Sequence, residues 1–314
     1  MKCRFWGVRG SIPTPLKTDE IKEKTRKVLL GARGVDLGDA VAVDDYLRSI
    51  PDYEIGSVGG NSSCVEVRAG DNLLIFDAGS GLRELGLSLM RGDFGKGAGA
   101  AHIFLSHTHW DHIMGIPFFV PAYLKGNSIN FYGGHDRLEE RIRAQQDPEH
   151  FPVSMDMMAA SFSFNRLQPG GRYDISDVTV IPFIMNHPGV TFGYRVEFLN
   201  RSFVYASDTE FTEMSDEHTR FLKNADVLVL DTMYTFDDVI EKMDWGHCTP
   251  MIGIDLALRE NVGKLVLFHH EPTYSDEKLV RLWKKAVDYK KKMAPGSDLE
   301  VILAREGLEI DLNG

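Results

Sequence analysis

The chain has 314 residues, of which 43% are hydrophobic and 26% charged, and its formal net charge is -11. This balance is typical of a folded globular protein and excludes disorder over most of the length. No stretch approaches the roughly 20 consecutive apolar residues of a membrane span, and no apolar run follows the basic residues at the start, so we expect neither a membrane partner nor a secretory signal. Proteins that bind many phosphates normally carry a basic excess, so the acidic charge disfavours long nucleic acid as a partner.

The three cysteines, Cys3, Cys64 and Cys248, are far apart in the sequence and form no CxxC pair. An odd number of widely spread cysteines suits a reducing compartment better than a disulfide framework. We therefore expect a cytoplasmic protein.

The predicted elements begin with a strand over 2–11 that runs into a turn. Residues 16–58 differ in composition, with charged helical spacing over 17–30 and a second short helix over 41–50. We interpret this segment as an insertion that is a lid over a pocket, a solvated surface excursion or a dimer contact.

From Gly59 onward, strands and helices alternate to the end, without a repeat or a linker long enough to divide domains. Strands are predicted at 63–67, 73–76, 102–106, 129–132, 178–183, 192–198, 203–206, 227–230 and 265–269. Helices are predicted at 82–89, 136–144, 250–259 and 276–292. The sequence therefore predicts one α/β domain over 1–314 with an insertion at about 16–58, and a homodimer remains open.

The most informative segment is the run from Ser106 to His112, which reads Ser-His-Thr-His-Trp-Asp-His and directly follows an apolar strand. Neutral imidazole nitrogens and carboxylates are the usual ligands of zinc and related metals. Alternate residues at a strand end turn to the same side, so His107 and His109 can share one ion. Asp111 and His112 lie past the turn, where a second ion can bind.

Further candidate ligands follow later strands. His187 follows the 178–183 strand, Asp208 follows the 203–206 strand, and His269 and His270 end the 265–269 strand. A carboxylate has two oxygens and can bridge two ions, which suits Asp208. The repeated placement of a ligand type after a strand favours one shared site.

This order of motifs resembles the metallo-β-lactamase superfamily over nearly the whole chain. The resemblance implies a four-layer αββα sandwich, a supporting role for Asp77, and two divalent metal ions, with zinc expected first and manganese or iron as alternatives. It assigns His107, His109 and His187 to the first ion, Asp111, His112 and His269 to the second, and Asp208 to a bridge between them. His270 is then a candidate for supporting a ligand or for facing the substrate.

Within the superfamily, the segments Gly60-Asn61-Ser62-Ser63, Asp77-Ala78-Gly79-Ser80-Gly81 and Gly246-His247-Cys248-Thr249 look like ribonuclease Z and related phosphodiesterases. By this resemblance His247 contacts the scissile phosphate and donates a proton, while the alternative is a residue that only starts a helix beside the cap-like Thr249. The His-Glu pair of ribonuclease Z has no match at 230–233, where Asp231 is the candidate replacement for its carboxylate. A long Gly/Pro-rich arm that holds tRNA is also lacking between 133 and 187.

The predicted function is therefore that of a metal-dependent hydrolase, a dinuclear phosphodiesterase acting on cyclic nucleotides or related small phosphodiesters through a metal-bridging hydroxide. Asp208 and Asp111 would fix the hydroxide, and His247 would protonate the leaving oxygen. The alternatives are a tRNA 3′-processing endonuclease, a thioester or lactone hydrolase on the same metals, and a metal-binding sensor without turnover.

Several other side chains are candidates for substrate contacts. A base can stack on Trp110, Tyr234 or Trp245, although core packing is the stronger expectation for Trp245. Arg9, Arg33 and Arg83 are the candidates for holding phosphate.

Overall fold

The strands form two sheets of seven in the computed structural model, which describes residues 1–210, 220–241 and 245–312. The first sheet has the order β14-β1-β2-β3-β4-β5-β6 and contains β1 (Lys2–Gly7), β2 (Cys64–Ala69), β3 (Asn72–Phe76), β4 (Ala100–Phe104), β5 (Ser128–Gly133), β6 (Ser161–Arg166) and β14 (Glu309–Asp311). The second has the order β13-β12-β11-β10-β9-β8-β7 and contains β7 (Tyr173–Ile175), β8 (Val178–Met185), β9 (Thr191–Phe198), β10 (Arg201–Ala206), β11 (Val227–Asp231), β12 (Lys264–Phe268) and β13 (Glu300–Leu303).

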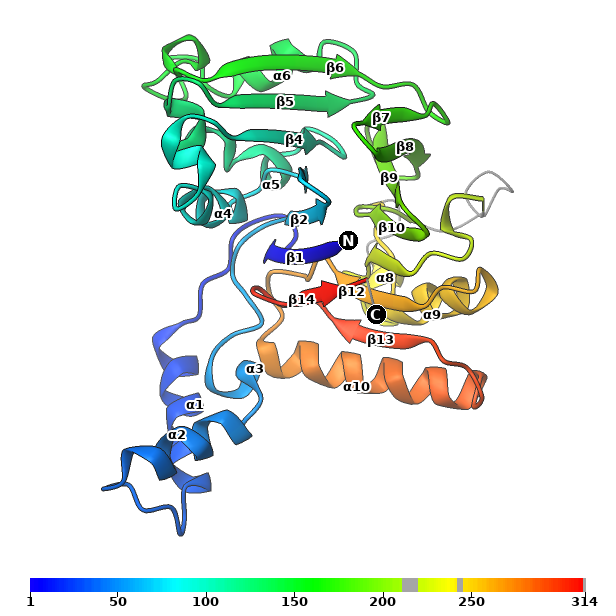
Figure 1. The fold of residues 1–314 in the computed structure, drawn as a ribbon. Coiled ribbons are helices and arrows are strands. Elements are labelled where there is room, and N and C mark those ends of the chain that lie inside the picture. Colours follow the sequence, from blue (N-terminus) through cyan, green and yellow to red (C-terminus); the bar gives the residue numbers. More distant parts are fainter. Residues whose placement is uncertain (211–219, 242–244, 313–314) are drawn as a thin grey trace.

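The helices lie outside the sheets (Figure 1). They are α1 (Thr18–Gly31), α2 (Ala40–Ser49), α3 (Asp52–Ile55), α4 (Gly81–Leu89), α5 (Trp110–Ile113), α6 (Leu138–Ala144), α8 (Phe236–Glu241), α9 (Pro250–Arg259) and α10 (Asp276–Met293), with 3₁₀ helices η1 (Asp93–Lys96), η2 (Ile116–Phe118), η3 (Val120–Tyr123) and η4 (Met155–Met157). Among the described residues, none of these helices has the length and apolar character needed to cross a membrane.

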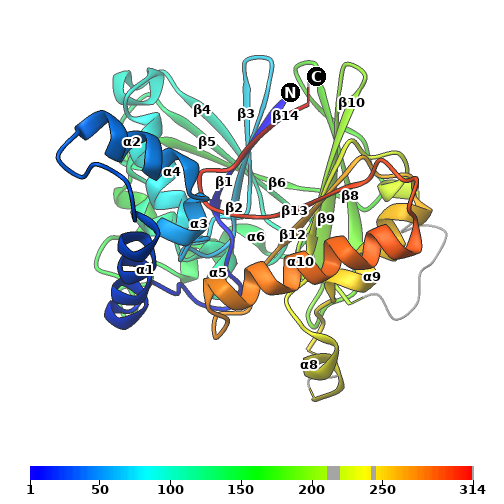
Figure 2. The ribbon, with the colours of Figure 1, turned by 90° about the horizontal axis from the view of Figure 1, so that it is seen from below.

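Alternating side chains on the inner strands divide among three hydrophobic layers. On β3, Leu74 and Phe76 face the core between the sheets, while Leu73 and Ile75 face the helix α4. On β12, residues 266 and 268 join the same central core, while residues 265 and 267 pack beneath α9 and α10. Figure 2 shows the two sheets facing each other with helices on both outer sides. Three apolar layers require four layers of backbone, so the predicted αββα sandwich is confirmed.

Strand directions bring the predicted ligands to one edge of the sandwich. β3 and β4 are parallel, as are β10, β11 and β12. β8 is antiparallel to β9, which is antiparallel to β10, so β8 runs in the direction of β10. The carboxyl ends of parallel strands meet at the same edge of a sheet. A hydrogen bond of 2.7 Å from the Tyr205 hydroxyl to the Asp77 carboxylate joins the two sheets there.

The segment between β1 and β2 carries α1, α2 and α3, and Figure 1 shows α1 and α2 projecting away from the sheets. None of these three helices contains a buried residue. The side chain of Lys24 connects α1 to α10 through a 3.1 Å ion pair with Asp276. The segment therefore packs beside α10.

Candidate metal centre

The backbone at the ends of three strands is turned into an unusual conformation. Asp77, Asp208 and His269 have φ angles of 59°, 49° and 59°, in the left-handed region that side chains rarely adopt. Such conformations persist where the surrounding structure enforces them, and they cluster at functional sites. The turns follow β3, β10 and β12, so the same edge of the sandwich holds all three.

The short helix α5 orders the densest part of the motif. His109 precedes α5 with an extended backbone, and its first turn carries Asp111 and His112. His107, immediately before this turn, is 3% exposed, and His112 is fully buried. The segment thereby directs all four side chains toward the carboxyl ends of the second sheet.

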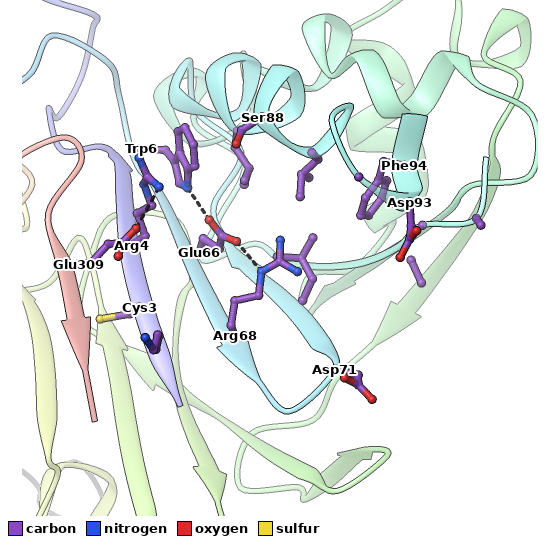
Figure 3. A pocket seen from close by; sticks show the side chains of 18 residues that line it. Cys3, Arg4, Trp6, Glu66, Arg68, Asp71, Ser88, Asp93, Phe94 and Glu309 are labelled. Carbon is purple, nitrogen blue, oxygen red and sulfur yellow. Dashed lines mark hydrogen bonds and ion pairs between the residues drawn. The ribbon is translucent and has the colours of Figure 1, made fainter. Parts of the chain in front are cut away.

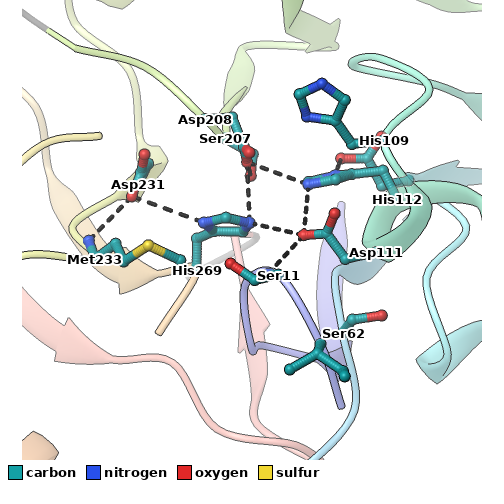
Figure 4. A network of polar contacts seen from close by, with 12 residues as sticks. Ser11, Ser62, His109, Asp111, His112, Ser207, Asp208, Asp231, Met233 and His269 are labelled. Carbon is teal, nitrogen blue, oxygen red and sulfur yellow. Dashed lines mark hydrogen bonds and ion pairs between the residues drawn. The ribbon is translucent and has the colours of Figure 1, made fainter. Parts of the chain in front are cut away.

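The structure brings all seven predicted ligands together. Their nitrogen and oxygen atoms form groups of three in which every atom lies within 4.8 Å of the others: His107, His109 and His187; His107, His112 and Asp208; and Asp111, His112 and His269. The first and third groups correspond to the two predicted ions, and Asp208 stands between them. Figure 4 shows Asp208, Asp111, His112 and His269 pointing toward one another.

Four buried carboxylates surround this cluster: Asp77, Asp111, Asp208 and Asp231 are each at most 6% exposed. Among the described residues their ion-pair partners are all histidines, and no lysine or arginine pairs with them. Buried charge is costly unless it is compensated. The excess of negative charge therefore fits bound divalent cations.

Most of the cluster has the protonation state that metal binding requires. Burial lowers the pKa of the His107 and His187 imidazoles. Burial alone would raise the pKa of Asp111, but the charge of His112 holds it below its ordinary value. Metals bind neutral imidazole and ionised carboxylate. Burial lowers the pKa of His112, but the surrounding carboxylates outweigh burial and raise it. This raised pKa is a further effect of the excess of negative charge at the site.

Neighbouring groups orient the candidate ligands. The Asp77 carboxylate lies 2.7 Å from Nδ1 of His112, so the opposite ring nitrogen faces the cluster. The Gly246 carbonyl lies 3.0 Å from Nδ1 of His187. Within the described part of the chain, the buried Nε2 of His187 has no hydrogen-bond partner. Ligating histidines commonly use one nitrogen for such a support and the other for the metal, so this arrangement fits a bound ion.

The two adjacent histidines at the end of β12 have different surroundings. Nε2 of His269 lies 3.1 Å from Asp208 and 3.3 Å from Asp111. His270 is equally buried, but its Nε2 lies 2.8 Å from the carbonyl oxygen of Ala304, and His270 does not line the cavity at the site. The geometry therefore favours His269 as the ligand, and the substrate-facing role considered for His270 is not supported.

His247 lies beside the cluster and is held by Asp231. Nδ1 of His247 is 2.7 Å from Oδ2 of Asp231, and the Asp231 carboxylate also accepts hydrogen bonds from the backbone of Thr209 and Met233. Burial lowers the pKa of His247, but the charge and hydrogen bond of Asp231 outweigh it and raise the value to about 9. The ring is thus oriented and kept protonated at neutral pH. The helix-start alternative explains only Thr249, whose side chain caps α9.

A cavity of about 340 Å³ opens onto this site. It is lined by Ser11, His109, Asp111, His187, Pro188, Asp208, Trp245, His247 and His269. No residue of the 16–58 insertion lines it, which does not support the lid interpretation. A substrate that enters this cavity meets the candidate ligands and His247 together.

Sequence reasoning missed the contribution of Ser11. Its backbone N–H donates a 2.8 Å hydrogen bond to the Asp111 carboxylate, and its φ of 60° places it in the left-handed region. No chemical signal in the sequence identifies a contact made by backbone. Arg9, a candidate for holding phosphate, is buried and bonds instead to the Gly59 carbonyl and the Asp276 carboxylate, so that expectation is wrong.

A larger cavity of about 560 Å³ lies elsewhere, between the first sheet and α4 (Figure 3). Four of its charged side chains are paired within the lining: Glu66 accepts hydrogen bonds from Trp6 and Arg68, and Arg4 bonds to Glu309. None of the candidate metal ligands lines it. The chemistry therefore belongs to the smaller cavity.

The family model of the β-lactamase superfamily domain matches residues 72–270, which is more than half of the chain. The chain belongs to the β-lactamase superfamily. The resemblance drawn from the motifs is thus confirmed, and so is the hydrolase class.

Individual relatives agree with this membership. A ribonuclease Z of Thermoplasma acidophilum is 24% identical over 268 residues, covering 68% of this chain and 81% of its own length. The metallo-β-lactamase fold protein YhfI from Bacillus subtilis has a TM-score of 0.64 at 19% identity, covering 98% of both chains. The short form of human tRNase Z also has a TM-score of 0.64, at 17% identity, covering 100% of both chains.

These relatives correct the expectation about partners. Long nucleic acid was disfavoured by the net charge of -11, yet relatives that match two thirds of this chain are named for a ribonuclease. Net charge is summed over the whole surface, whereas phosphate is bound at a local site where metal ions supply the positive charge. The acidic composition therefore does not exclude RNA, and the comparisons do not show a small phosphodiester as the partner.

Proposed function

We propose that this protein hydrolyses phosphodiester bonds of nucleotides, with His247 as the general acid. The observation that carries the proposal is the Asp231–His247 pair, in which the two side chains are 2.7 Å apart and His247 lines the same cavity as the candidate metal ligands. A proton donor beside a site that would hold divalent cations is the arrangement needed to expel an alkoxide from phosphate.

Two divalent ions fit the donor set. We assign His107, His109 and His187 to one, Asp111, His112 and His269 to the other, and Asp208 to both. Nitrogen-rich sites with carboxylates suit zinc first, and manganese or iron as alternatives. When bound, such ions would neutralise charge on the phosphate and lower the pKa of water.

The residues of the chain perform the remaining tasks. Asp111, held by the Ser11 N–H, orients the nucleophile on one side of the phosphate. His247 donates its proton to the departing oxygen on the other side, and Asp231 keeps the ring in place and stabilises its charge. An alkoxide needs this proton, whereas a thiolate leaves without one. The pair therefore favours a phosphodiester over a thioester.

Cyclic nucleotides and related small diesters are the substrates that the sequence motifs favour. A second candidate is the 3′-processing of tRNA precursors, which is favoured by the relatives named ribonuclease Z. Both reactions break a phosphodiester of a nucleotide, and the proposed roles of Asp111 and His247 are the same in each.

Two further proposals concern the setting of the enzyme. The described cysteines Cys3, Cys64 and Cys248 are buried and free, which supports a reducing, cytoplasmic location. The central hydrophobic core draws residues from both ends of the chain, which supports one domain over 1–314 with the insertion at about 16–58.

The test is hydrolysis of bis(p-nitrophenyl) phosphate, of 2′,3′- and 3′,5′-cyclic nucleotides and of a tRNA precursor, by protein loaded with zinc or manganese and analysed for metal. We expect turnover in the wild type, its loss in Asp111→Ala, and no change in Asp298→Ala, which replaces an exposed aspartate. The preferred substrate decides between the two candidates. Absence of turnover on every diester, with two ions bound, would refute the proposal.

A further inference from the structure

Trp245 lies at the mouth of the candidate active site. Its side chain is 61% exposed and lines the cavity together with Pro188 and His247. Core packing was the stronger expectation for this residue, and its exposure shows that expectation to be wrong. Aromatic side chains commonly line the cavities in which proteins hold ligands, so the place of Trp245 in this lining suits contact with a substrate.

Other aromatic side chains near the site do not offer the same surface. Tyr234 is 2% exposed and meets the His247 ring edge-on, with centroids 5.2 Å apart. Trp110 is 80% exposed, but its side chain is outside the cavity. Among the described residues that line this cavity, Trp245 is therefore the one aromatic side chain apart from the histidines.

Gly246 fixes the position of Trp245 relative to the chemistry. Gly246 has a φ of 78°, and a Cβ there would lie 2.5 Å from both the His187 ring and Pro188. Its carbonyl is the group that orients His187. The peptide that follows Trp245 is thus packed tightly against a candidate metal ligand, and His247 comes directly after it.

We infer that Trp245 is the stacking platform for the base of the leaving nucleoside, and so determines specificity for substrates that carry a base there. The inference rests on the proposed function. His247 donates its proton to the leaving oxygen, so the nucleoside attached to that oxygen lies on the side of the cavity occupied by His247 and Trp245. Every base presents a π-face, so stacking favours any nucleoside over an abasic group without selecting a sequence.

The test compares two dinucleotides that differ only on the leaving side. One is adenylyl-(3′→5′)-uridine, which releases adenosine when its 3′-oxygen departs, and the other has an abasic sugar in place of adenosine. Loss of a base–aromatic stack lowers kcat/KM by roughly 5- to 150-fold. We expect Trp245→Ala to show this loss on the first dinucleotide, mainly through KM, and to be unchanged on the abasic one.

Two further variants make the result specific. Trp245→Phe keeps an aromatic face and should recover most of kcat/KM. Phe236→Ala removes another exposed aromatic side chain, 74% exposed and outside the cavity, and should behave as the wild type. Adenosine should also quench the tryptophan fluorescence of the wild type, and this quenching should be absent in Trp245→Phe.

Each other outcome overturns the inference. An equal loss on both dinucleotides would show a structural role for Trp245, and no loss, or a phenylalanine no better than alanine, would show that no base stacks there. A wild type that cleaves other diesters but not adenylyl-(3′→5′)-uridine would also overturn the inference. If the wild type cleaves no diester at all, including the cyclic nucleotides and the tRNA precursor, the proposed function itself fails, which is a separate result seen before any variant is made.

Discussion

The role of His247 as a general acid makes a sharp prediction about leaving groups. His247→Ala removes the proton donor, and Asp231→Asn keeps the donor but removes the carboxylate 2.7 Å from its Nδ1. Departure of a nucleoside alkoxide needs a proton, whereas p-nitrophenolate leaves without one. Both variants should therefore impair nucleotide diesters far more than bis(p-nitrophenyl) phosphate.

The size of each effect follows from the site. General acid catalysis contributes about 10²- to 10⁴-fold, so His247→Ala should lower kcat on nucleotide diesters by about that factor. The rise in the pKa of His247 from 6.5 to about 9 corresponds to about 3 kcal/mol of preference for the protonated ring. The Asp231 carboxylate is the main cause of this raised pKa, so Asp231→Asn should lower kcat on nucleotide diesters roughly 100-fold at pH 8.

The pH dependence has a definite sign. A raised pKa keeps the acid form of His247 present up to about pH 9 in the wild type. Without the carboxylate, burial lowers the pKa, so the acid form is lost at a lower pH. The defect of Asp231→Asn should therefore be smaller at pH 6 than at pH 8, while the defect of His247→Ala should not depend on pH in this way.

The assay measures kcat and KM for both substrate types across pH 6–9, with metal content determined for every variant. His150→Ala, which replaces an exposed histidine, is the matched control and should be unaffected. Equal losses on nucleotide diesters and on bis(p-nitrophenyl) phosphate, with metal retained, would refute the general-acid reasoning and indicate a structural role for His247.

Three further predictions concern stability. Chelation should lower the thermal unfolding midpoint of the wild type, because the buried carboxylates lose their compensating cations; a midpoint that does not move, or that moves equally in Asp208→Ala, would count against a metal at Asp208. Burial lowers the pKa of His270 to about 3, so unfolding takes up a proton below pH 6.5. The free energy of unfolding should therefore fall by about 1.4 kcal/mol per pH unit as the pH drops from 6.5 toward 3. His270→Gln keeps a donor for the Ala304 carbonyl and should make this pH dependence smaller in urea unfolding at pH 7 and 5; an unchanged dependence would contradict the role of His270. Asp276→Ala leaves the buried Arg9 without its 3.2 Å carboxylate partner and should lower the free energy of unfolding by about 3–5 kcal/mol. Lys24→Met is the control, because it removes only the outer partner of Asp276. A loss in Asp276→Ala no greater than in Lys24→Met would show that backbone carbonyls alone satisfy Arg9.

The sequence determined the inner strands well and missed the outer ones. The unpredicted strands β6, β7, β13 and β14 are the four edge strands of the two sheets. An edge strand is paired on one side only. Strands β7, β13 and β14 have only three or four residues each, and no residue of β6 is buried. Inner strands such as β3 bury four of five residues and produce the apolar runs that the sequence shows.

The sequence by itself also determined the candidate ligands, because ligand chemistry restricts them to a few residue types and because each follows a strand. It left His269 and His270 open, since both end the same strand, and only their three-dimensional surroundings separate them. Ser11 contributes through its backbone N–H and Trp245 through its exposed side chain, and the residue type predicts neither property. Asp231 ends β11 and lies 16 residues from His247, and only the tertiary structure shows that its carboxylate contacts the ring. Residue type fixes which chemistry is possible, whereas distance and exposure depend on packing between segments far apart in the chain.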